Sequence, residues 1–364
     1  MLNLYAILQG RSEETDLFIM DEQKDRTEIS SLGEFKLIDH LTKNFEINNI
    51  SSVKGIGDDA AIIDNAGKLT VVTTDMLVEG VHFDMMYTPL LHLGYKCIAV
   101  NVSDIYAMNA TPNQVTVSIA ISNRFSVEAL EELYEGIFHA CEYYGVDLVG
   151  GDTTTSIKGL IISVTAIGDA NEGEIVYRSG AKEEDLICVS GDLGAAYLGL
   201  QMLEREKKIY LENPNIQPDL ENKKHLIGKF LKPEARKDII QFFKDNDIIP
   251  TAMIDVSDGL SSEILHICDK SDCGAIIYEN QIPMSDESIE QASKFNLDPT
   301  ICALNGGEDY ELLFTINSKD AEKIALNNNI SIIGKIVPKQ NGTFIKTKND
   351  NLFKLKAQGW DSFK

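Results

Sequence analysis

The alternation of apolar and polar positions predicts helices and strands in turn along most of the chain. Apolar residues recur at helical spacing between Ser126 and Gly145, where a serine cap and a glycine end fit a helix. A second helix is expected from about Pro89 to Met108. Short apolar runs predict strands at residues 60–63, 69–73, 115–121, 146–149, 160–167, 186–189 and 311–316. This mixture indicates an α/β or α+β fold.

The first two strands are expected to pair with each other. Residues 60–63 run into the turn Asp64–Gly67, and residues 69–73 return and end at Thr74 and Asp75. Further helices are expected at residues 35–45, 193–205 and 260–273, with a polar loop at residues 213–224.

Two breaks in the pattern divide the chain. Residues 1–30 are rich in Glu, Asp, Thr and Ser, and we expect them to form a mobile extension. Residues 168–174 lack apolar periodicity and hold two glycines and three acids, so we place a domain boundary there. The chain of 364 residues suits two domains. They are expected at residues 31–169 and 170–364.

Charge and composition narrow the class of protein. The net charge of −24 repels nucleic acids and anionic membrane surfaces, so we expect neither as a partner. No apolar run approaches the ~18 residues of a membrane span. The six cysteines are scattered without CxxC spacing, which predicts reduced core thiols in a cytoplasmic protein.

Six apolar runs stop at a carboxylate beside glycine or a small hydroxyl residue. The sites are Gly57-Asp58-Asp59, Thr73-Thr74-Asp75, Ser103-Asp104, Gly150-Gly151-Asp152, Asp255-Val256-Ser257-Asp258-Gly259 and Gly306-Gly307-Glu308-Asp309. Carboxylates supply the hard oxygen ligands that Mg²⁺ prefers. Turns that contain glycine leave backbone N–H groups available to bind a phosphate. The pattern favours a Mg²⁺-dependent enzyme acting on phosphate compounds.

Each site also has a structural interpretation. Thr73, Thr74 and Asp75 offer adjacent oxygens to one cation, but Asp75 alone would be an ordinary strand-end acid. Ser257 or Asp258 would cap the helix that follows, and that helix end also favours a phosphate.

Several other enzyme classes lack their motifs here. The chain has no GxxxxGK[ST] loop, no HRD-type catalytic loop and no GxSxG elbow. Residues 55–60 match a loose GxGxxA pattern, but a strand and a turn follow where a dinucleotide site needs a helix. No histidines pair at zinc spacing.

Taken together, the motifs resemble those of thiamine-monophosphate kinases. The matching segments run in order from about Gly33 to Trp360, and they include TTDMLVEGVHF at 73–83, NVSD at 101–104, GGDT at 150–153, RSGA at 178–181, DVSDGL at 255–260 and GGEDYE at 306–311. The likeness leaves out only the N-terminal extension.

The resemblance implies a fold of the aminoimidazole-ribonucleotide-synthetase type. It implies a homodimer whose N-terminal domains pair through their sheets. The implied reaction transfers the γ-phosphate of ATP directly to thiamine monophosphate with several Mg²⁺ ions, giving thiamine diphosphate and ADP. Because the acceptor is already an anionic phosphate, no strong general base is needed.

Site roles follow from the same resemblance. The implied Mg²⁺ ligands are Asp58, Asp59, Thr73, Thr74, Asp75, Asp104, Asp152, Asp255 and Asp258. ATP contacts are implied for Tyr134, Gly151, Asp152, Arg178 and Ser257. Substrate contacts are implied for His82, Glu308 and Trp360, and the catalytic set is Asp75, Asp258 and Arg178. Tyr134 also lies on the apolar stripe of its helix, so a core position competes.

Two departures and two rivals remain. The family's His-x-Arg-Pro motif is replaced by Phe230-Leu231-Lys232-Pro233, and the N-terminal extension has no counterpart. Within the superfamily, no cysteine precedes Cys97 and the chain ends at Lys364, which disfavours selenophosphate synthetases and hydrogenase-maturation members. A purine-pathway synthetase stays open. So does a non-enzymatic regulator that binds Mg²⁺ and nucleotide.

Overall fold

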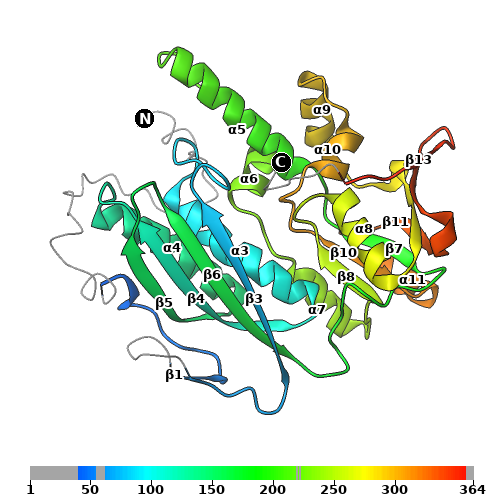
Figure 1. Cartoon of the computed structure of the whole chain (residues 1–364), viewed down its shortest axis with the longest axis horizontal. Helices are drawn as coiled ribbons and strands as arrows, with labels where there is room; N and C mark the ends of the chain where they lie inside the picture. The colour runs from blue at the N-terminus through cyan, green and yellow to red at the C-terminus, as the bar shows by residue number, and fades with distance from the viewer. Residues whose placement is uncertain (1–39, 55–61, 219, 221–222, 358–364) are drawn as a thin grey trace.

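The computed structural model describes residues 40–54, 62–218, 220 and 223–357. The expected extension at residues 1–30 and the first part of the helix expected at residues 35–45, up to residue 39, therefore lie outside the described residues. Figure 1 shows a four-stranded sheet backed by helices on one side of the molecule and a larger sheet on the other. The mixed α/β fold expected from the sequence is confirmed.

The four-stranded sheet has the order β3-β6-β4-β5. Its strands are β3 (Leu69–Val78), β4 (Thr111–Ile121), β5 (Asp147–Thr155) and β6 (Ile161–Ala170). Strand β3 pairs with β6 along its whole length, from Leu69 opposite Ala170 to Val78 opposite Ile161. The short strands β1 (Ser52–Lys54) and β2 (Ile62–Ile63) pair with each other. The expected hairpin of residues 60–63 with 69–73 is therefore wrong, because long-range pairing with β6 holds β3.

Two helices, α3 (Leu90–Ala107) and α4 (Val127–Tyr144), cover one face of this sheet (Figure 1). Helix α3 is buried around nearly its whole circumference, since it packs against the sheet, α4 and elements of the second half. Helix α4 has the predicted ends: the Ser126 side chain accepts from Ala129 N, and Gly145 adopts the left-handed conformation at its end. The two backbones touch, because a Cβ added at Gly94 or Gly136 would meet a carbonyl oxygen of the other helix within 2.0 Å.

The second half is built on a seven-stranded sheet of order β13-β12-β9-β11-β7-β10-β8. Its strands are β7 (Leu186–Ser190), β8 (Ala252–Asp255), β9 (Gly274–Tyr278), β10 (Leu312–Ile316), β11 (Ile330–Val337), β12 (Thr343–Lys346) and β13 (Leu352–Lys354). Its helices are α5 (Ala195–Glu212), α6 (Lys224–Leu231), α7 (Lys237–Asp245), α8 (Leu260–Ser271), α9 (Asp286–Lys294), α10 (Pro299–Asn305) and α11 (Ala321–Ile324), with short 3-10 turns η2 (Glu279–Gln281), η3 (Ser318–Asp320) and η4 (Lys339–Asn341).

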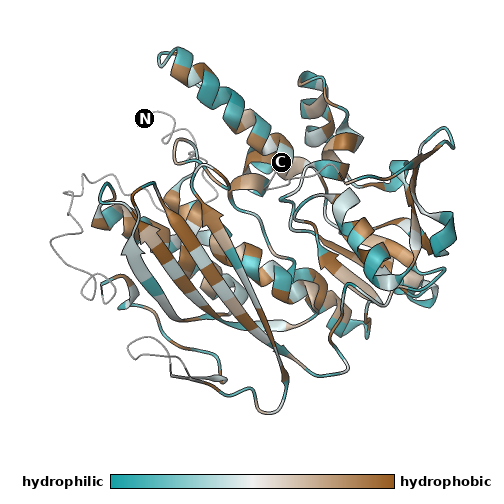
Figure 2. Cartoon of the chain, in the orientation of Figure 1, coloured by the Kyte–Doolittle hydropathy of each residue, from teal (hydrophilic) through white to brown (hydrophobic). Residues whose placement is uncertain are grey.

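The two halves share a hydrophobic core. One cluster joins residues of α3, α4 and the four-stranded sheet with Cys188, Phe243, Met253 and Phe314 of the second half. Helix α5 projects away from both sheets, and its outer part is largely hydrophilic (Figure 2). The shared core fixes α3 between the halves, so side chains on this helix reach groups from both. The domain boundary near residue 170 stays a prediction.

Candidate functional site

A cavity of about 1150 Å3 opens between the two halves of the molecule. The first half contributes β3, the segment after it and α3, and the second contributes α5, α6, α10 and the segments after β8 and α10. Seven of the sequence-predicted site residues line it: Asp75, His82, Asp104, Asp255, Ser257, Asp258 and Glu308. The structure thus brings together acids that lie up to 233 residues apart in the sequence.

Three carboxylates at the base of the cavity, Asp75, Asp104 and Asp255, have raised pKa values, and burial is the first cause for each. Solvent reaches Asp75, yet the surrounding protein and the Asp104 carboxylate raise its pKa to about 6. Burial and then Asp104 raise the pKa of Asp255 to about 8, and burial raises that of Asp104. Close carboxylates without a balancing cation behave in this way, because each disfavours the charge on its neighbours. The base of the cavity is therefore suited to a cation.

Hydrogen bonds from hydroxyl and amide groups fix these acids. The Thr73 hydroxyl donates to Asp104 Oδ2 at 2.6 Å, and the Ser103 hydroxyl donates to Asp255 Oδ2 at 2.7 Å. The backbone N–H of Asp75 donates to Asn101 Oδ1 at 3.0 Å. Since Asn101, Ser103 and Asp104 all lie on α3, this helix aligns the acids of β3 and β8.

Strand geometry separates Thr74 from its neighbours. Strand β3 continues to Val78, so Asp75 lies inside a strand and the prediction that the strand ends there is wrong. Successive side chains of a strand point to opposite faces. The Thr74 hydroxyl donates to Val164 O at 2.9 Å on the neighbouring strand. The Thr74 hydroxyl therefore bonds within the sheet, on the face opposite Thr73 and Asp75, and a metal role for Thr74 through its backbone oxygen stays a prediction.

The start of α8 is capped from within the helix. Glu263 Oε1 accepts the backbone N–H groups of Ser257 at 3.1 Å and Asp258 at 2.7 Å. The residue at the cap position is Gly259, and its φ of 112° is one that glycine adopts readily. The side chains of Ser257 and Asp258 therefore do not cap the helix, and both residues line the cavity.

Residues of the segment Gly306–Glu311 alternate between the cavity and the protein interior. Glu308 and Tyr310 line the cavity and both have positive φ, 60° and 51°, which is uncommon for residues other than glycine. Backbone N–H groups of these two residues donate to Ser257 O at 2.7 Å and Val256 O at 2.9 Å. These bonds hold the strained segment against the segment that carries Asp258.

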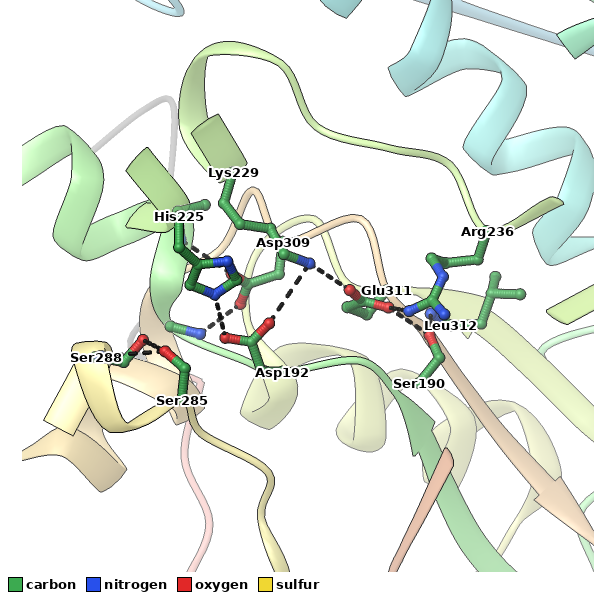
Figure 3. Close-up of polar contacts among 12 residues, drawn as sticks. Ser190, Asp192, His225, Lys229, Arg236, Ser285, Ser288, Asp309, Glu311 and Leu312 are labelled. Atoms are coloured by element: carbon green, nitrogen blue, oxygen red, sulfur yellow. Dashed lines mark hydrogen bonds and ion pairs between the residues drawn. The ribbon is translucent and has the colours of Figure 1, made fainter. Parts of the chain in front are cut away.

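The alternate residues Asp309 and Glu311 are buried, and Figure 3 shows both in one network of polar contacts. Asp309 accepts the backbone N–H groups of Gly194 and Ala196, and burial raises its pKa to about 7. Glu311 is fully buried and pairs with both Lys229 and Arg236. The sequence motif is therefore anchored by Asp309 and Glu311 and presents Glu308 and Tyr310.

His82 faces the same cavity in a neutral form. Its Nδ1 accepts from Val78 N at 3.1 Å, which leaves the proton on Nε2. Burial lowers its pKa, although nearby Glu308 opposes that shift. A neutral imidazole with a free N–H suits contact with an acceptor on a ligand.

Six of the described predicted residues do not line the cavity: Thr73 and Thr74 on β3, and Tyr134, Gly151, Asp152 and Arg178. Tyr134 is buried on α4, where burial raises its pKa to about 12 and its ring meets Phe138 edge-on, so the core position is the one observed. Gly151 and Asp152 are exposed on β5, and a Cβ on Gly151 would meet Val117 O at 1.9 Å. Arg178 is exposed, and its charge partly opposes the rise that burial causes in the pKa of Asp104 and Asp258.

Three further predicted residues, Asp58, Asp59 and Trp360, lie outside the described residues. Across the described ranges, no three His, Cys, Asp or Glu side chains converge closely enough to form a preassembled metal site. Any cation held by the cavity acids would therefore need additional oxygen ligands.

Some residues of the site gave no motif signal. The cavity wall includes an array in which Lys207 donates to Asp84 Oδ2 at 2.6 Å and Tyr87 donates to Glu204 Oε1 at 2.7 Å. Behind the wall lies Lys96, fully buried on α3. The sequence did indicate Lys96 in one way: it lies among apolar residues of the expected helix, where a lysine is buried only when it is paired.

Comparisons with known proteins agree with this geometry. Residues 57–170 match the family described as "AIR synthase related protein, N-terminal domain". The thiamine-monophosphate kinase of Bacillus subtilis (strain 168) is 32% identical over 342 residues, covering 92% of this chain and 100% of that protein.

Two solved structures cover most of the chain. One is described as "AaThiL complexed with AMPPCP and TMP"; it is 32% identical, has a TM-score of 0.70 and covers 94% of this chain and 100% of its own. The other is a thiamine-monophosphate kinase from Stenotrophomonas maltophilia K279a. It is 32% identical, has a TM-score of 0.74 and covers 86% of this chain and 96% of its own.

In the described part of the chain, no helix combines the length and the hydropathy needed to cross a membrane.

Proposed function

The chain belongs to the thiamine-monophosphate kinase family, and we propose that it transfers the γ-phosphate of ATP to thiamine monophosphate, giving thiamine diphosphate and ADP. The observation that carries this proposal is the full-length relation to the Bacillus subtilis enzyme. The cavity between the two halves is consistent with it, since its acids and strained segment come from the motifs on which the resemblance rests.

We propose Mg²⁺ as the cation of the carboxylate cluster. Mg²⁺ is typically bound through one or two carboxylates and completed by substrate phosphates and water. The pKa values of Asp75 and Asp255, raised by burial and then by Asp104, and the lack of a preassembled three-ligand site among the described residues fit that donor set. Asp75, Asp104, Asp255 and Asp258 would hold the ions, with Thr73 orienting Asp104. Bound Mg²⁺ would neutralise the phosphate charges.

The remaining proposed ligands and contacts rest on the family resemblance. Asp58, Asp59 and Asp152 would contribute further Mg²⁺ ligands, and Gly151, Asp152, Ser257 and Tyr134 would contact ATP. For Tyr134, its burial in the core makes any contact indirect. Arg178 would bind a phosphate, because its charge already acts on Asp104 and Asp258.

The chain itself supplies positioning rather than a covalent intermediate. The acceptor phosphate carries the nucleophilic oxygen and is ionised at neutral pH, so transfer needs alignment and charge balance. Among the described residues lining the cavity, Cys302 is the cysteine, and burial raises its pKa to about 11, so it is a poor nucleophile. The side chains of Asp75, Asp258 and Arg178 are the proposed catalytic set.

A group of acidic and aromatic residues in the cavity lining suits the organic half of thiamine monophosphate. Glu204, Asp298 and Glu308 line the cavity together with the rings of Tyr87 and Tyr197. Acidic and aromatic groups favour a cationic ring such as thiazolium. We assign His82 and Glu308 to this contact, and Trp360 by the family resemblance.

We also propose a homodimer formed through the four-stranded sheet. One face of this sheet is covered by α3 and α4, while the other carries the cross-strand pairs Val72–Ile167 and Met76–Ser163, with Val72 60% exposed. The exposed apolar side chains on this mixed face, Val72 and Met76, favour burial against a second copy. The six free cysteines agree with a cytoplasmic location.

One assay tests the function and separates it from its rivals. The purified protein with Mg²⁺ and ATP should convert thiamine monophosphate to thiamine diphosphate and should form no aminoimidazole product from the purine-pathway substrate. A protein that binds Mg²⁺-ATP by calorimetry but converts neither substrate would be a regulator instead, and the proposed function would be wrong.

A further inference from the structure

Among the residues that the structure describes, Lys96 is the one lysine with a fully buried side chain. Only 2% of its side chain is exposed, although it sits on α3 beside an open cavity. Burying an ammonium group is costly unless charged and polar partners replace water. The three groups around its Nζ therefore indicate what this residue does.

The partners of Lys96 all belong to the second half of the molecule. Its Nζ donates to Glu308 Oε2 at 2.6 Å and to Phe230 O at 3.0 Å, and it lies 4.1 Å from the centre of the Phe230 ring. Helix α3 also carries Asn101, Ser103 and Asp104, which hold the acids at the base of the cavity. Through Lys96, the same helix also holds Glu308, which lines the cavity from the second half of the molecule.

Glu308 depends on this contact for its place. Its backbone φ of 60° is strained, and the residue after next, Tyr310, is strained as well. Its neighbours Asp309 and Glu311 are fixed in the buried network of polar contacts (Figure 3). Among the described residues, Lys96 is the cation paired with Glu308, and the Glu308 side chain remains 27% exposed to the cavity.

The ion pair has a consequence for a ligand. A carboxylate has about four acceptor sites, so the bond from Lys96 leaves Glu308 able to accept from a donor in the cavity. The same bond offsets one negative charge in a cavity that must admit a phosphate between Asp75, Asp104, Asp255 and Asp258. His82 is close enough to this ion pair to be affected by both of its charges: Glu308 raises the pKa of His82, and Lys96 lowers it.

We propose that Lys96 is a positioning residue for the acceptor substrate: it fixes the Glu308 carboxylate from the other half of the molecule and so sets the affinity for thiamine monophosphate. The inference rests on the proposed function and adds a residue to which no role has been given. Lys96 acts through Glu308 and does not itself touch the substrate.

A double-mutant cycle of Lys96→Met and Glu308→Gln tests this role. K96M should raise the KM for thiamine monophosphate by about tenfold or more and change the KM for ATP by less than about twofold. In the E308Q background, K96M should add less than about twofold, because the group through which Lys96 acts has been neutralised. K96R should recover part of the lost affinity, since arginine restores the charge.

A second lysine of this protein provides the control for the loss of a positive charge. Lys68, which pairs with Asp169 away from the cavity, offers K68M as a control for charge removal, and its kinetics should match wild type. If K96M alone does not fold, the neutral pair K96M/E308Q still permits comparison with E308Q. An equal loss from K96M with and without Glu308, or equal increases in both KM values, would overturn the inference. A wild-type protein without kinase activity would instead overturn the proposed function.

Discussion

At the scale of single residues, the side-chain alternation of β3 decides which oxygens reach the cavity. Thr73 and Asp75 face α3, where they meet Asp104 and Asn101, whereas the Thr74 hydroxyl bonds to the neighbouring strand. At the cavity, burial and then the charge of Asp104 raise the pKa of Asp75 and of Asp255. Their charge is the feature on which the proposed chemistry depends.

Asp75→Asn should therefore separate activity from stability. We expect turnover to fall roughly 1000-fold, the order found when a charge-stabilising group is removed from an active site. The melting temperature should stay the same or rise, because the change removes repulsion with Asp104. Asp245→Asn, at an exposed position on α7, is the control and should keep full activity. Wild-type turnover by D75N would remove Asp75 from the site.

The sequence was informative about which residues meet, but less so about how. Glycine and acid motifs identified Asp75, Asp104, Asp255 and Glu308, and all four line one cavity. They did not indicate that β3 continues past Asp75 or that Glu263 caps α8, because both depend on partners distant in sequence or on side-chain direction. Lys96 carried no motif, since its role comes from packing between the halves.

At the scale of elements, α3 and α4 touch through glycines. A Cβ on Gly136 would lie 1.9 Å from Leu91 O, so Gly136→Ala must push the helices apart. We expect the free energy of unfolding to fall by about 1–3 kcal/mol. Activity should fall as well, because α3 carries Asp104.

Gly228→Ala on α6 is the matched control for that change. Nothing lies within 4 Å of a Cβ added there, so this variant should be neutral or slightly more stable. Chemical denaturation of both variants measures the difference. Equal stability of G136A and wild type would show that the helices are not in close contact.

Helix α6 should be held in a pH-dependent way by His225 (Figure 3). Its Nε2 lies 2.8 Å from Asp192 Oδ2, and this hydrogen bond raises the pKa of His225 above 6.5, while the pKa of Asp192 is lowered below 3.8. A raised pKa means that the stabilisation is present below pH 6.5 and is lost as the pH rises through the folded-state value.

Thermal melting of wild type and His225→Gln tests this sign. The wild type should melt higher than H225Q at about pH 5.5, and the difference should shrink by about pH 8.5. A difference that grows with pH would contradict the assigned ion pair.

At the scale of the whole molecule, two sheets and a shared core create one cavity, and the free face of the smaller sheet is the proposed dimer contact. Val72→Glu should shift the protein toward monomer in sedimentation, because it places a charge on that face, whereas Val72→Thr should not. A wild-type monomer at micromolar concentration would contradict the dimer.

The fold class was predictable from the alternation of apolar and polar residues, and the family was predictable from motifs in a fixed order. Both signals consist of residues that are close together in the sequence. The shared core and the order of the seven-stranded sheet were not predictable, since they arise from contacts between distant segments. The shape of the cavity belongs to this second group, although the motifs identified seven of its lining residues.

The central claim is direct phosphate transfer to a phosphate acceptor, and radiolabel transfer measures it. With γ-labelled ATP, Mg²⁺ and unlabelled thiamine monophosphate, label should appear in the terminal phosphate of thiamine diphosphate, with one ADP formed per product. Label appearing only as inorganic phosphate, or no label leaving ATP, would contradict the account.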